Sequence, residues 1–446
     1  MKVVLAVNGL GLGGTEKAVQ THALAFDRDL VDVSVVAVRE DGVRRRTLEA
    51  AGIEVNCAEG DPRRLRELFA GADVVHVTRA GVAEPLVPEA VAAAGVGVLV
   101  ESNVFGAVDA SADERSFSAH LFPSKMCALR YRTRLGLDGP DFHERHKVSF
   151  WPVDIARLRE LAPEPRAARE RLGLDPDRPV VIRVGRANDR KWRDLIVDMV
   201  PPLLHQAPEA QVVFVGATPA KLRRLDRLGV LERTLLLPPT SDEGELATFY
   251  AAADVFVTAA EIGESHSFAI EEAMCLGIPV VTCSTPWVDN AQIEQVDNGE
   301  TGWIADHPQP FAEAVASLLA DPELRASFSA RSRAKSDALY ADGPLTRQLE
   351  RLYGYLLGER PDPGDSLITP AELDAFGAEY ERRLEDGFRP LTEQERAETA
   401  LAYRRERVRW ATRAVRESLN PEGLRYAASV VRARLPSVSS APRGPG

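Results

Sequence analysis

The stretch GESHSFAIEEAMCLGIPVVT, residues 263–282, places a loop, a helix and an apolar strand in immediate succession. The helix is expected to begin near Phe268, and the run at 278–281 has the composition of a buried strand. Glu264 lies in the loop and Glu272 on the helix, with seven residues between them. A helix start presents unpaired N–H groups and partial positive charge, which suits a phosphate or sugar hydroxyls. A plain surface loop before an amphipathic helix is the alternative.

Alternating strand-like and helical runs extend on both sides of this stretch. In the first half, apolar runs stand at 2–7, 31–38, 53–56, 73–77, 96–100, 119–123 and 147–150. In the second half, similar runs stand at 179–184, 211–215, 234–237, 254–257 and 279–281. Such strands, separated by helices, are typical of parallel sheets covered on both faces. The sequence predicts an α/β fold of two doubly wound, Rossmann-like domains that face a cleft, where ligands bind.

Changes of pattern along the chain divide it into four parts. We expect one Rossmann-like domain at residues 1–160 and a second at 166–340, joined by a charged, proline-rich linker. After about residue 341 the pattern becomes wholly helical, which predicts a helical C-terminal extension over 341–435. The last residues, 436–446, are rich in Pro, Ser and Gly and are expected to be disordered.

The composition is that of an ordinary globular protein. With 446 residues, of which 45% are hydrophobic and 27% charged, the chain is expected to form two or three domains. Four scattered cysteines without CxxC spacing predict neither a disulfide framework nor a zinc site, which fits a reducing cytosol. The N-terminal run is too short for a signal peptide, and no run reaches the roughly 18 apolar residues of a spanning helix. We therefore expect a cytoplasmic protein, either soluble or peripheral to a membrane.

Charge is distributed unevenly along the chain. The net charge is −12, but residues 401–446 contain ten Arg, no Lys and three Glu, so this tail carries +7 and the rest −19. A basic helix expected at 401–419 can contact an anionic membrane surface. It can also pack against the acidic body or another subunit, which we favour because its apolar face is narrow. No nucleic-acid partner is expected.

A glycine-rich loop, NGLGLGGTE, joins the first expected strand to the first expected helix. Its glycines allow the backbone to approach a ligand closely, and the helix start beyond it attracts anions. The spacing of Gly9, Gly11 and Gly14 also fits the dinucleotide-binding pattern. That pattern needs an acidic residue after the second strand, and neither Arg39 nor Glu40 is well placed for the role. A plain tight turn is the remaining alternative.

A second loop, VGRANDRK, directly follows the first strand of the second domain and ends at Lys191. Arg186 and Lys191 stand five apart where a cleft-facing loop is expected, and a guanidinium and an ammonium together can hold a diphosphate. Fixed cations there would stabilise the charge that develops on a departing nucleoside diphosphate. The alternative is a generic basic surface, because Arg183, Arg190 and Arg193 are nearby.

Taken together, the glycine loop, the Arg-x4-Lys loop and the two carboxylates followed by an AMCLGIPVV run form a specific constellation. The DVVH strand at 73–76, the PVD turn at 152–154 and the IEQVDNGETG segment at 293–302 add to it. In these features the chain resembles the GT-B glycosyltransferases, most closely the retaining glycosyltransferase family 4. The resemblance covers about residues 1–357 and is strongest in the second domain.

The resemblance implies a role for each matching residue. Arg186 and Lys191 would bind the donor's diphosphate and assist its departure, and Glu264 would contact hydroxyls of the donor sugar. Glu272 would hold the ribose hydroxyls, while Gly13 and Gly14 would let the first-domain loop reach the donor. The partners implied are a nucleotide sugar, bound by the second domain, and an acceptor glycan or small molecule, bound by the first.

No metal or other cofactor is expected, because cations and a helix dipole serve this purpose in the family. We find no convincing Asp-x-Asp metal motif, and Asp175-Pro-Asp177, which stands in the linker, is expected to form a turn.

The sequence also departs from the family pattern. After Glu264, His266 stands where the family has an aromatic and Ser267 where it has a glycine, with Phe268 next. All three are candidate donor contacts, although we favour packing for His266.

The family's acceptor-side histidine after the fifth strand is replaced by Asn103, which can hydrogen-bond a hydroxyl but cannot act as a base. His76 and His120 are further acceptor-side candidates.

Three hypotheses follow. The leading one is a retaining glycosyltransferase that uses a nucleoside diphosphate sugar. A related GT-B enzyme, such as a sugar-nucleotide epimerase or a phosphorylase, is the second. The third is a catalytically silent sugar-binding or scaffold module, which the residues at 103, 266 and 267 motivate.

Overall fold

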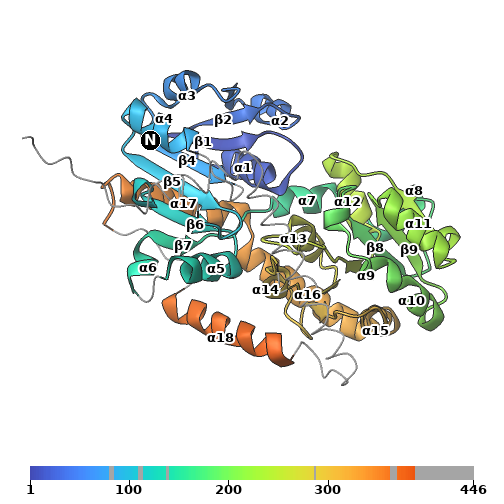
Figure 1. Ribbon diagram of the computed structural model, residues 1–446. Helices are drawn as coiled ribbons and strands as arrows, with labels where there is room; N and C mark the ends of the chain where they lie inside the picture. The colour runs from blue at the N-terminus through green and yellow to red at the C-terminus, as the bar shows by residue number, and fades with distance from the viewer. Residues whose placement is uncertain (80–84, 109–113, 137–139, 286–287, 362–368, 387–446) are drawn as a thin grey trace, which may run out of the picture.

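The computed structural model describes residues 1–79, 85–108, 114–136, 140–285, 288–361 and 369–386. Two parallel sheets, each with helices on its faces, lie side by side (Figure 1). This arrangement is the α/β fold of two doubly wound, Rossmann-like domains that the sequence predicts.

The first sheet has seven strands in the order β3-β2-β1-β4-β5-β6-β7, and every pair is parallel. The strands are β1 (Lys2–Gly9), β2 (Asp32–Glu40), β3 (Glu54–Cys57), β4 (Val74–Arg79), β5 (Val98–Asn103), β6 (Ala119–Phe122) and β7 (His146–Val148). Its helices are α1 (Gly14–Ala25), α2 (Arg45–Ala50), α3 (Pro62–Phe69), α4 (Leu86–Ala94), η1 (Glu114–Ser116), α5 (Lys125–Leu135) and α6 (Pro140–Arg145). The strand order reverses at β1, so the glycine loop after β1 lies where such sheets bind ligands.

The second sheet has six strands in the order β10-β9-β8-β11-β12-β13. The strands are β8 (Val180–Val184), β9 (Gln211–Val215), β10 (Thr234–Leu237), β11 (Val255–Val257), β12 (Val280–Thr282) and β13 (Gly302–Ile304). The edge strand β13 was not predicted, because three residues with a glycine give almost no periodic signal. The order reverses at β8, which places the Arg186–Lys191 loop at the corresponding position of this sheet.

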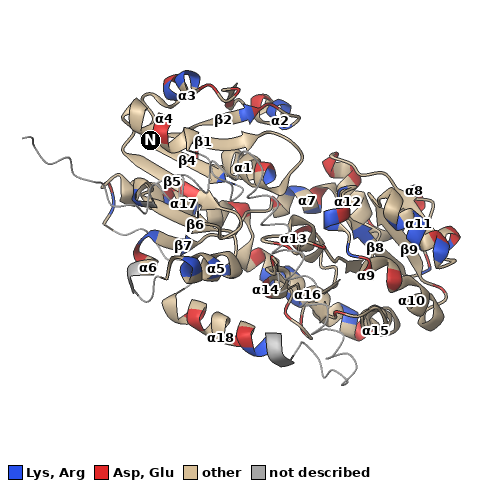
Figure 2. Ribbon diagram, in the orientation of Figure 1, with Lys and Arg blue, Asp and Glu red and all other residues tan. Residues whose placement is uncertain are grey.

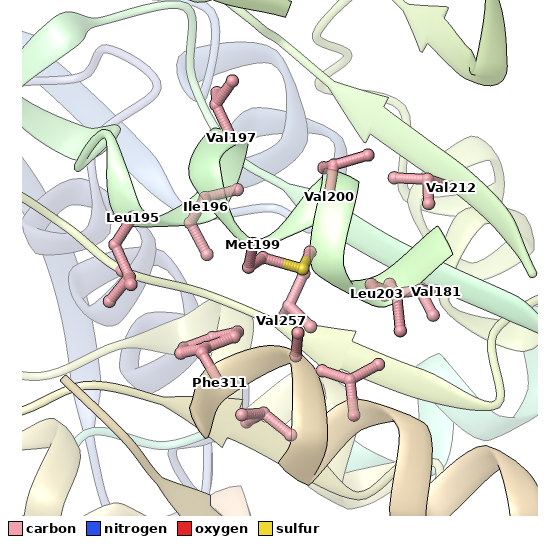
Figure 3. Close-up of a cluster of buried hydrophobic side chains, with 14 of the residues drawn as sticks. Val181, Leu195, Ile196, Val197, Met199, Val200, Leu203, Val212, Val257 and Phe311 are labelled. Atoms are coloured by element: carbon pink, nitrogen blue, oxygen red, sulfur yellow. The ribbon is translucent and has the colours of Figure 1, made fainter. Parts of the chain in front are cut away.

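Helices α7 (Ile155–Leu161) and α8 (Pro165–Arg171) flank the expected linker between the two domains. The second sheet is then covered by η2 (Asp189–Lys191), α9 (Leu195–Asp198), α10 (Val200–Gln206), α11 (Pro219–Arg227), η3 (Leu231–Arg233), α12 (Glu243–Ala251), α13 (Phe268–Cys275), α14 (Gln292–Gln295), α15 (Pro308–Ala320) and α16 (Pro322–Leu339). Figure 3 shows part of its core, where Met199 and Leu203 pack between the strand residues Val181 and Val257 and Phe311 of α15. Continuous apolar strands thus bury both faces of the sheet, as parallel sheets require.

Helix α17 (Asp342–Leu356) returns to the first domain after α16 has completed the second (Figure 1). Leu349, Leu352 and Tyr353 of this helix are buried in one cluster with the strands β1, β2 and β5. The Tyr353 hydroxyl lies 2.6 Å from Nδ1 of His76 on β4. The first domain therefore includes a helix from beyond residue 340, although the sequence places this segment in a separate extension.

Helix α18 (Pro370–Asp386) packs outside α5 and touches both domains. Leu373 is buried in a first-domain cluster, and Asp374 pairs with Arg132 at 2.6 Å. Tyr380 is hydrogen-bonded to Asn290, which lies in the second domain. The expected basic helix at 401–419 and the expected disordered tail at 436–446 lie outside the described residues, so both stay predictions.

Charged side chains gather on the outer helices of both domains, such as α2, α3 and α11 (Figure 2). Among the residues that the structure describes, no helix combines the length and apolar character needed to cross a membrane.

The packing of α17 in the first domain leads to a prediction about the free energy of unfolding. Leu349→Ala should lower the free energy of unfolding by about 2–5 kcal/mol, because it leaves a cavity in the first-domain core. Tyr355→Ala, on the exposed side of the same helix, should change it by no more than about 0.5 kcal/mol. Urea denaturation measures both variants. Equal effects would contradict the packing of α17 in the first domain.

A second prediction concerns acid. Burial lowers the pKa of His76 to about 4, and burial together with nearby His76 lowers the pKa of His22 to about 3. In the unfolded chain both histidines bind a proton near pH 6.5, whereas the folded protein excludes it. The contribution of these histidines to the free energy of unfolding is therefore largest above pH 6.5. Below pH 6.5 it decreases by about 1.4 kcal/mol per pH unit for each histidine, until the pH reaches the pKa of that histidine in the folded protein.

Comparison of unfolding free energies at pH 7 and pH 5 tests this assignment. His76→Gln should lose less stability than the wild type between the two pH values, even though it is less stable at pH 7. The exposed His205→Gln should show the wild-type pH dependence. A wild-type slope in His76→Gln would show that His76 does not carry the effect.

Candidate active site between the two domains

The candidate site lies where the carboxyl ends of β8 and β11 meet the glycine loop of the first domain. The loop after β8 carries Arg186 and leads through η2 to Lys191. Arg186 is exposed, and its carbonyl accepts a hydrogen bond of 3.1 Å from the Trp192 indole. Trp192 is completely buried in the second-domain core, so it fixes the backbone from which Arg186 projects.

Lys191 and Glu264 meet directly, although 73 residues separate them in the chain. The Nζ atom of Lys191 donates to Oε2 of Glu264 at 2.6 Å. The Glu264 side chain is only 11% exposed and that of Lys191 25%, so the pair is shielded from bulk water. The Lys191 ammonium and the unpaired backbone N–H groups at the helix start can both donate hydrogen bonds to a phosphate ester that binds beside this ion pair.

The loop that carries Glu264 is held in place by its neighbours. Gly263 has a φ of 63°, and a side chain there would collide with the Asp289 carbonyl, so only glycine fits. The side chain of Gln292 accepts from the Glu264 N–H at 3.1 Å. Gln295 both accepts from the Ser267 N–H at 3.0 Å and donates to its carbonyl at 3.2 Å. Two glutamines of α14 thus set the position of the loop.

Glu272 has partners from both domains. Its Oε2 accepts from the Tyr250 hydroxyl at 2.8 Å, and its Oε1 accepts from Nζ of Lys17 on α1. Burial and the charge of Glu272 raise the pKa of Tyr250, so this hydroxyl stays a donor. A carboxylate with two fixed donors can exchange one of them for a ligand hydroxyl.

The glycine loop lies against the start of α13. A Cβ at Gly14 would be 3.3 Å from the ring of Phe268, so the ring would have to shift by a few tenths of an ångström to admit it. Gly13 is the N-cap of α1, and a side chain there would collide with Glu16. Phe268 stacks on Trp151 with ring centres 5.9 Å apart. The starts of α1 and α13, which both attract anions, therefore approach one another across the domain boundary.

His266 is buried in an aromatic cluster. Its ring lies edge-on to Trp151 at 5.2 Å, and Nε2 lies 2.9 Å from Oε2 of Glu271. Nδ1 lies 3.2 Å from the Pro123 carbonyl oxygen of the first domain. His266 thus packs in the aromatic cluster, as we favour, and its candidate role as a donor contact stays a prediction. Ser267, also buried, is the N-cap of α13, but its side chain makes no capping hydrogen bond.

A second first-domain cation reaches the other side of the site. Arg130 of α5 pairs with Asp289 and donates to the Val288 carbonyl at 2.7 Å. Burial raises the pKa of Asp289, whereas Arg130 and nearby Lys191 oppose the rise. The Asp289 carbonyl lies against Gly263, the residue before Glu264, so this contact borders the loop that carries the Lys191–Glu264 pair.

The side chains of the three acceptor-side candidates, Asn103, His76 and His120, make their hydrogen bonds within the first domain. Asn103 donates to the Ala107 carbonyl at 2.7 Å and so closes the turn after β5. His76 lies between Tyr353 and Ser102 and is 3% exposed. In this structure none of these contacts leads toward the Lys191–Glu264 pair.

His120, the third candidate, contacts Glu101 at 2.5 Å, and Glu101 also pairs with Arg79 at 2.6 Å. Burial opposes ionisation of Glu101, but His120 and Arg79 outweigh it and lower the pKa of the carboxyl group. The cluster is a buried, compensated network at the carboxyl ends of β4 to β6.

Among the described residues, no three or more His, Cys, Asp or Glu side chains are grouped so that they could hold a metal ion. Metal independence stays a prediction.

Several contributors to the site carry no local sequence signal. They are Lys17, Arg130, Tyr250, Asp289, Gln292 and Gln295. Each acts through a partner on a distant segment, so spacing along the chain could not reveal them.

Comparison with known proteins gives the site a context. Residues 165–335 match the family described as "Glycosyl transferases group 1". The D-inositol 3-phosphate glycosyltransferase 2 of Catenulispora acidiphila is 35% identical over 190 residues, 40% of this chain and 43% of that protein. The GDP-mannose-dependent alpha-(1-6)-phosphatidylinositol monomannoside mannosyltransferase of Mycolicibacterium smegmatis is 33% identical over 41% of this chain and 49% of its own. The chain spans about half the length of the curated relatives it matches.

Solved structures resemble a larger part of the chain. Anabaena HepE in complex with UDP superposes with a TM-score of 0.64 at 18% identity, over 78% of this chain and 98% of HepE. A sucrose-phosphate synthase from Thermosynechococcus elongatus gives a TM-score of 0.61 at 17% identity, over 81% of this chain and 100% of the synthase. The chain therefore has the GT-B fold, and its second domain carries the pattern of the group 1 glycosyl transferases.

Proposed function

We propose that the protein is a glycosyltransferase that moves a sugar from a nucleoside diphosphate sugar to an acceptor bound by the first domain. The observation that carries this proposal is the contact of Lys191 with Glu264, 2.6 Å long, beside the start of α13. It joins a cation suited to a diphosphate with a carboxylate suited to sugar hydroxyls. The bond that is broken in a sugar nucleotide joins the sugar to the diphosphate, so it would lie between Lys191 and Glu264.

Each part of the donor has a matching feature. Arg186 and Lys191 bind the diphosphate and stabilise the negative charge that grows as it departs. Glu264 orients the sugar through its hydroxyls, and Glu272 binds the ribose hydroxyls. The glycine loop at Gly13 and Gly14 closes over the donor and excludes water.

We further propose that transfer retains the configuration of the sugar. The acceptor oxygen bonds to the anomeric carbon on the same face from which the diphosphate departs, and the acceptor proton passes to the departing phosphate oxygen. This route needs no side-chain base, which agrees with an asparagine at residue 103. No metal is required, because Arg186, Lys191 and two helix starts supply positive charge.

The names of similar proteins suggest donors and acceptors to try first. HepE has been crystallised with UDP and with UDP-glucose, and the mycobacterial mannosyltransferase is named as dependent on GDP-mannose. Several relatives are named D-inositol 3-phosphate glycosyltransferases, which makes this acceptor the first candidate. We place the reaction in the cytoplasm. Membrane contact through the basic tail and oligomer formation remain proposals.

The first test is turnover with UDP-glucose and GDP-mannose, followed as release of free nucleoside diphosphate in the presence of D-inositol 3-phosphate. Lys191→Met and Glu264→Gln should each lower the rate by about 10²–10³-fold, because each removes one fixed electrostatic contact to the transition state. Lys191→Met leaves the Glu264 carboxylate without its cation, so its unfolding midpoint should fall. A single cooperative transition and a native circular dichroism spectrum in both variants separate loss of chemistry from loss of fold.

The matched control is Arg190→Met, which removes an exposed cation beside Lys191 and should leave turnover nearly unchanged. Undiminished turnover in Lys191→Met and Glu264→Gln would refute the roles assigned to them. Nucleotide binding without release of any product by the wild type would favour a silent sugar-binding module. Epimerised nucleotide sugar, or sugar phosphate, would favour the other enzyme classes.

A further inference from the structure

Lys17 is the residue of the first domain that reaches the ribose side of the candidate site. It lies in the first turn of α1, four residues after the N-cap Gly13, and its ammonium pairs with Glu272 across the domain boundary. The Lys17 side chain is 23% exposed and that of Glu272 is 8% exposed. The contact is therefore partly shielded from water yet open enough for a ligand to displace it.

The position of Lys17 is unfavourable for the helix that carries it. The N-terminal turn of a helix has a partial positive charge, so a cation there is repelled and an anion is preferred. The Lys17 ammonium also lies 5.4 Å from the ring centre of Phe268, the first residue of α13. Glu16 and Glu271 are the acidic residues in the first turns of α1 and α13, and Glu272 is the anion that the Lys17 ammonium contacts.

A ribose bound at Glu272 would compete with Lys17 for the same carboxylate. Its Oε2 is held by Tyr250, so a ribose hydroxyl that binds the free edge of the carboxylate competes with Lys17 for Oε1. Once displaced, the ammonium remains beside Phe268 at the start of α13, and the diphosphate, which joins a ribose at Glu272 to a sugar at Glu264, would lie within its reach. An anionic ligand would there replace the carboxylate as its partner.

We propose that Lys17 exchanges Glu272 for the donor's phosphate oxygens when a nucleotide binds. This inference rests on the proposed function, because it assumes that Glu272 receives the ribose. Lys17 then acts as a specificity-determining residue supplied by the first domain, and it favours a nucleoside diphosphate over an unphosphorylated nucleoside. The same exchange links nucleotide binding to contact between the domains.

Isothermal titration of uridine against UDP, and of guanosine against GDP, tests the exchange in the full-length protein. In Lys17→Met the affinity for the nucleoside should stay the same or increase, because a competitor for Glu272 is gone. The affinity for the diphosphate should fall at least tenfold. The ratio of the two dissociation constants should therefore fall at least tenfold, and Lys17→Arg should restore most of it.

Lys2→Met, at the opposite end of β1, is the matched control and should keep the wild-type ratio. If Lys17 only holds the domains together, Lys17→Met would weaken nucleoside and diphosphate equally, which would overturn the inference and leave the proposed function intact. If neither UDP nor GDP binds the wild type, the proposed function itself fails and the inference with it.

Discussion

The candidate site depends on one constraint, which is that the negative charges of two carboxylates shielded from water must be balanced by nearby cations or hydrogen bonds. Glu264 and Glu272 both lie in the loop and helix that follow β11, and both are largely removed from water. A carboxylate in such surroundings is costly unless a cation or several hydrogen bonds accompany it. Glu264 meets Lys191 of its own domain, whereas Glu272 meets Lys17 of the other. Glu272 therefore takes its paired cation from the first domain, and the two domains complete the site together.

Contacts from the first domain frame this site on two sides. Lys17 approaches Glu272 on one side, and Arg130 approaches Asp289 on the other. The backbone amides of Lys125 and Met126, at the start of α5, also bond the carboxylate of Glu294 at 3.0 and 3.2 Å. These contacts are polar and can be exchanged for ligand or water, in contrast to the apolar cores within each domain. Opening of the domains would also have to separate the apolar packing of Trp151 on Phe268.

The sequence predicts the features that are local in character. Apolar runs mark the strands, and their alternation with helices indicates two parallel sheets, which the structure confirms. The loop after β8 and the two carboxylates are found in the same way, because they stand at fixed offsets from a strand or a helix start. Glu264 and Lys191 are brought together as the two loops predict.

The remaining features depend on tertiary contacts that spacing does not encode. The periodicity of α17 identifies a helix but not the domain that buries Leu349 and Tyr353. His76 was a candidate for the acceptor side because of its residue type, whereas burial beneath α17 gives it a role in the core. Lys17 resembles any exposed lysine in an amphipathic helix until its partner, 255 residues away, is known.

The central claim is that a nucleotide binds between the two domains at these paired charges. Hydrogen–deuterium exchange of the wild type, with and without UDP or GDP, tests it most directly. Binding should slow amide exchange in two segments at once, the glycine loop at 9–17 in the first domain and the loop and helix at 263–275 in the second. Protection confined to one domain, or found only elsewhere in the chain, would contradict the account.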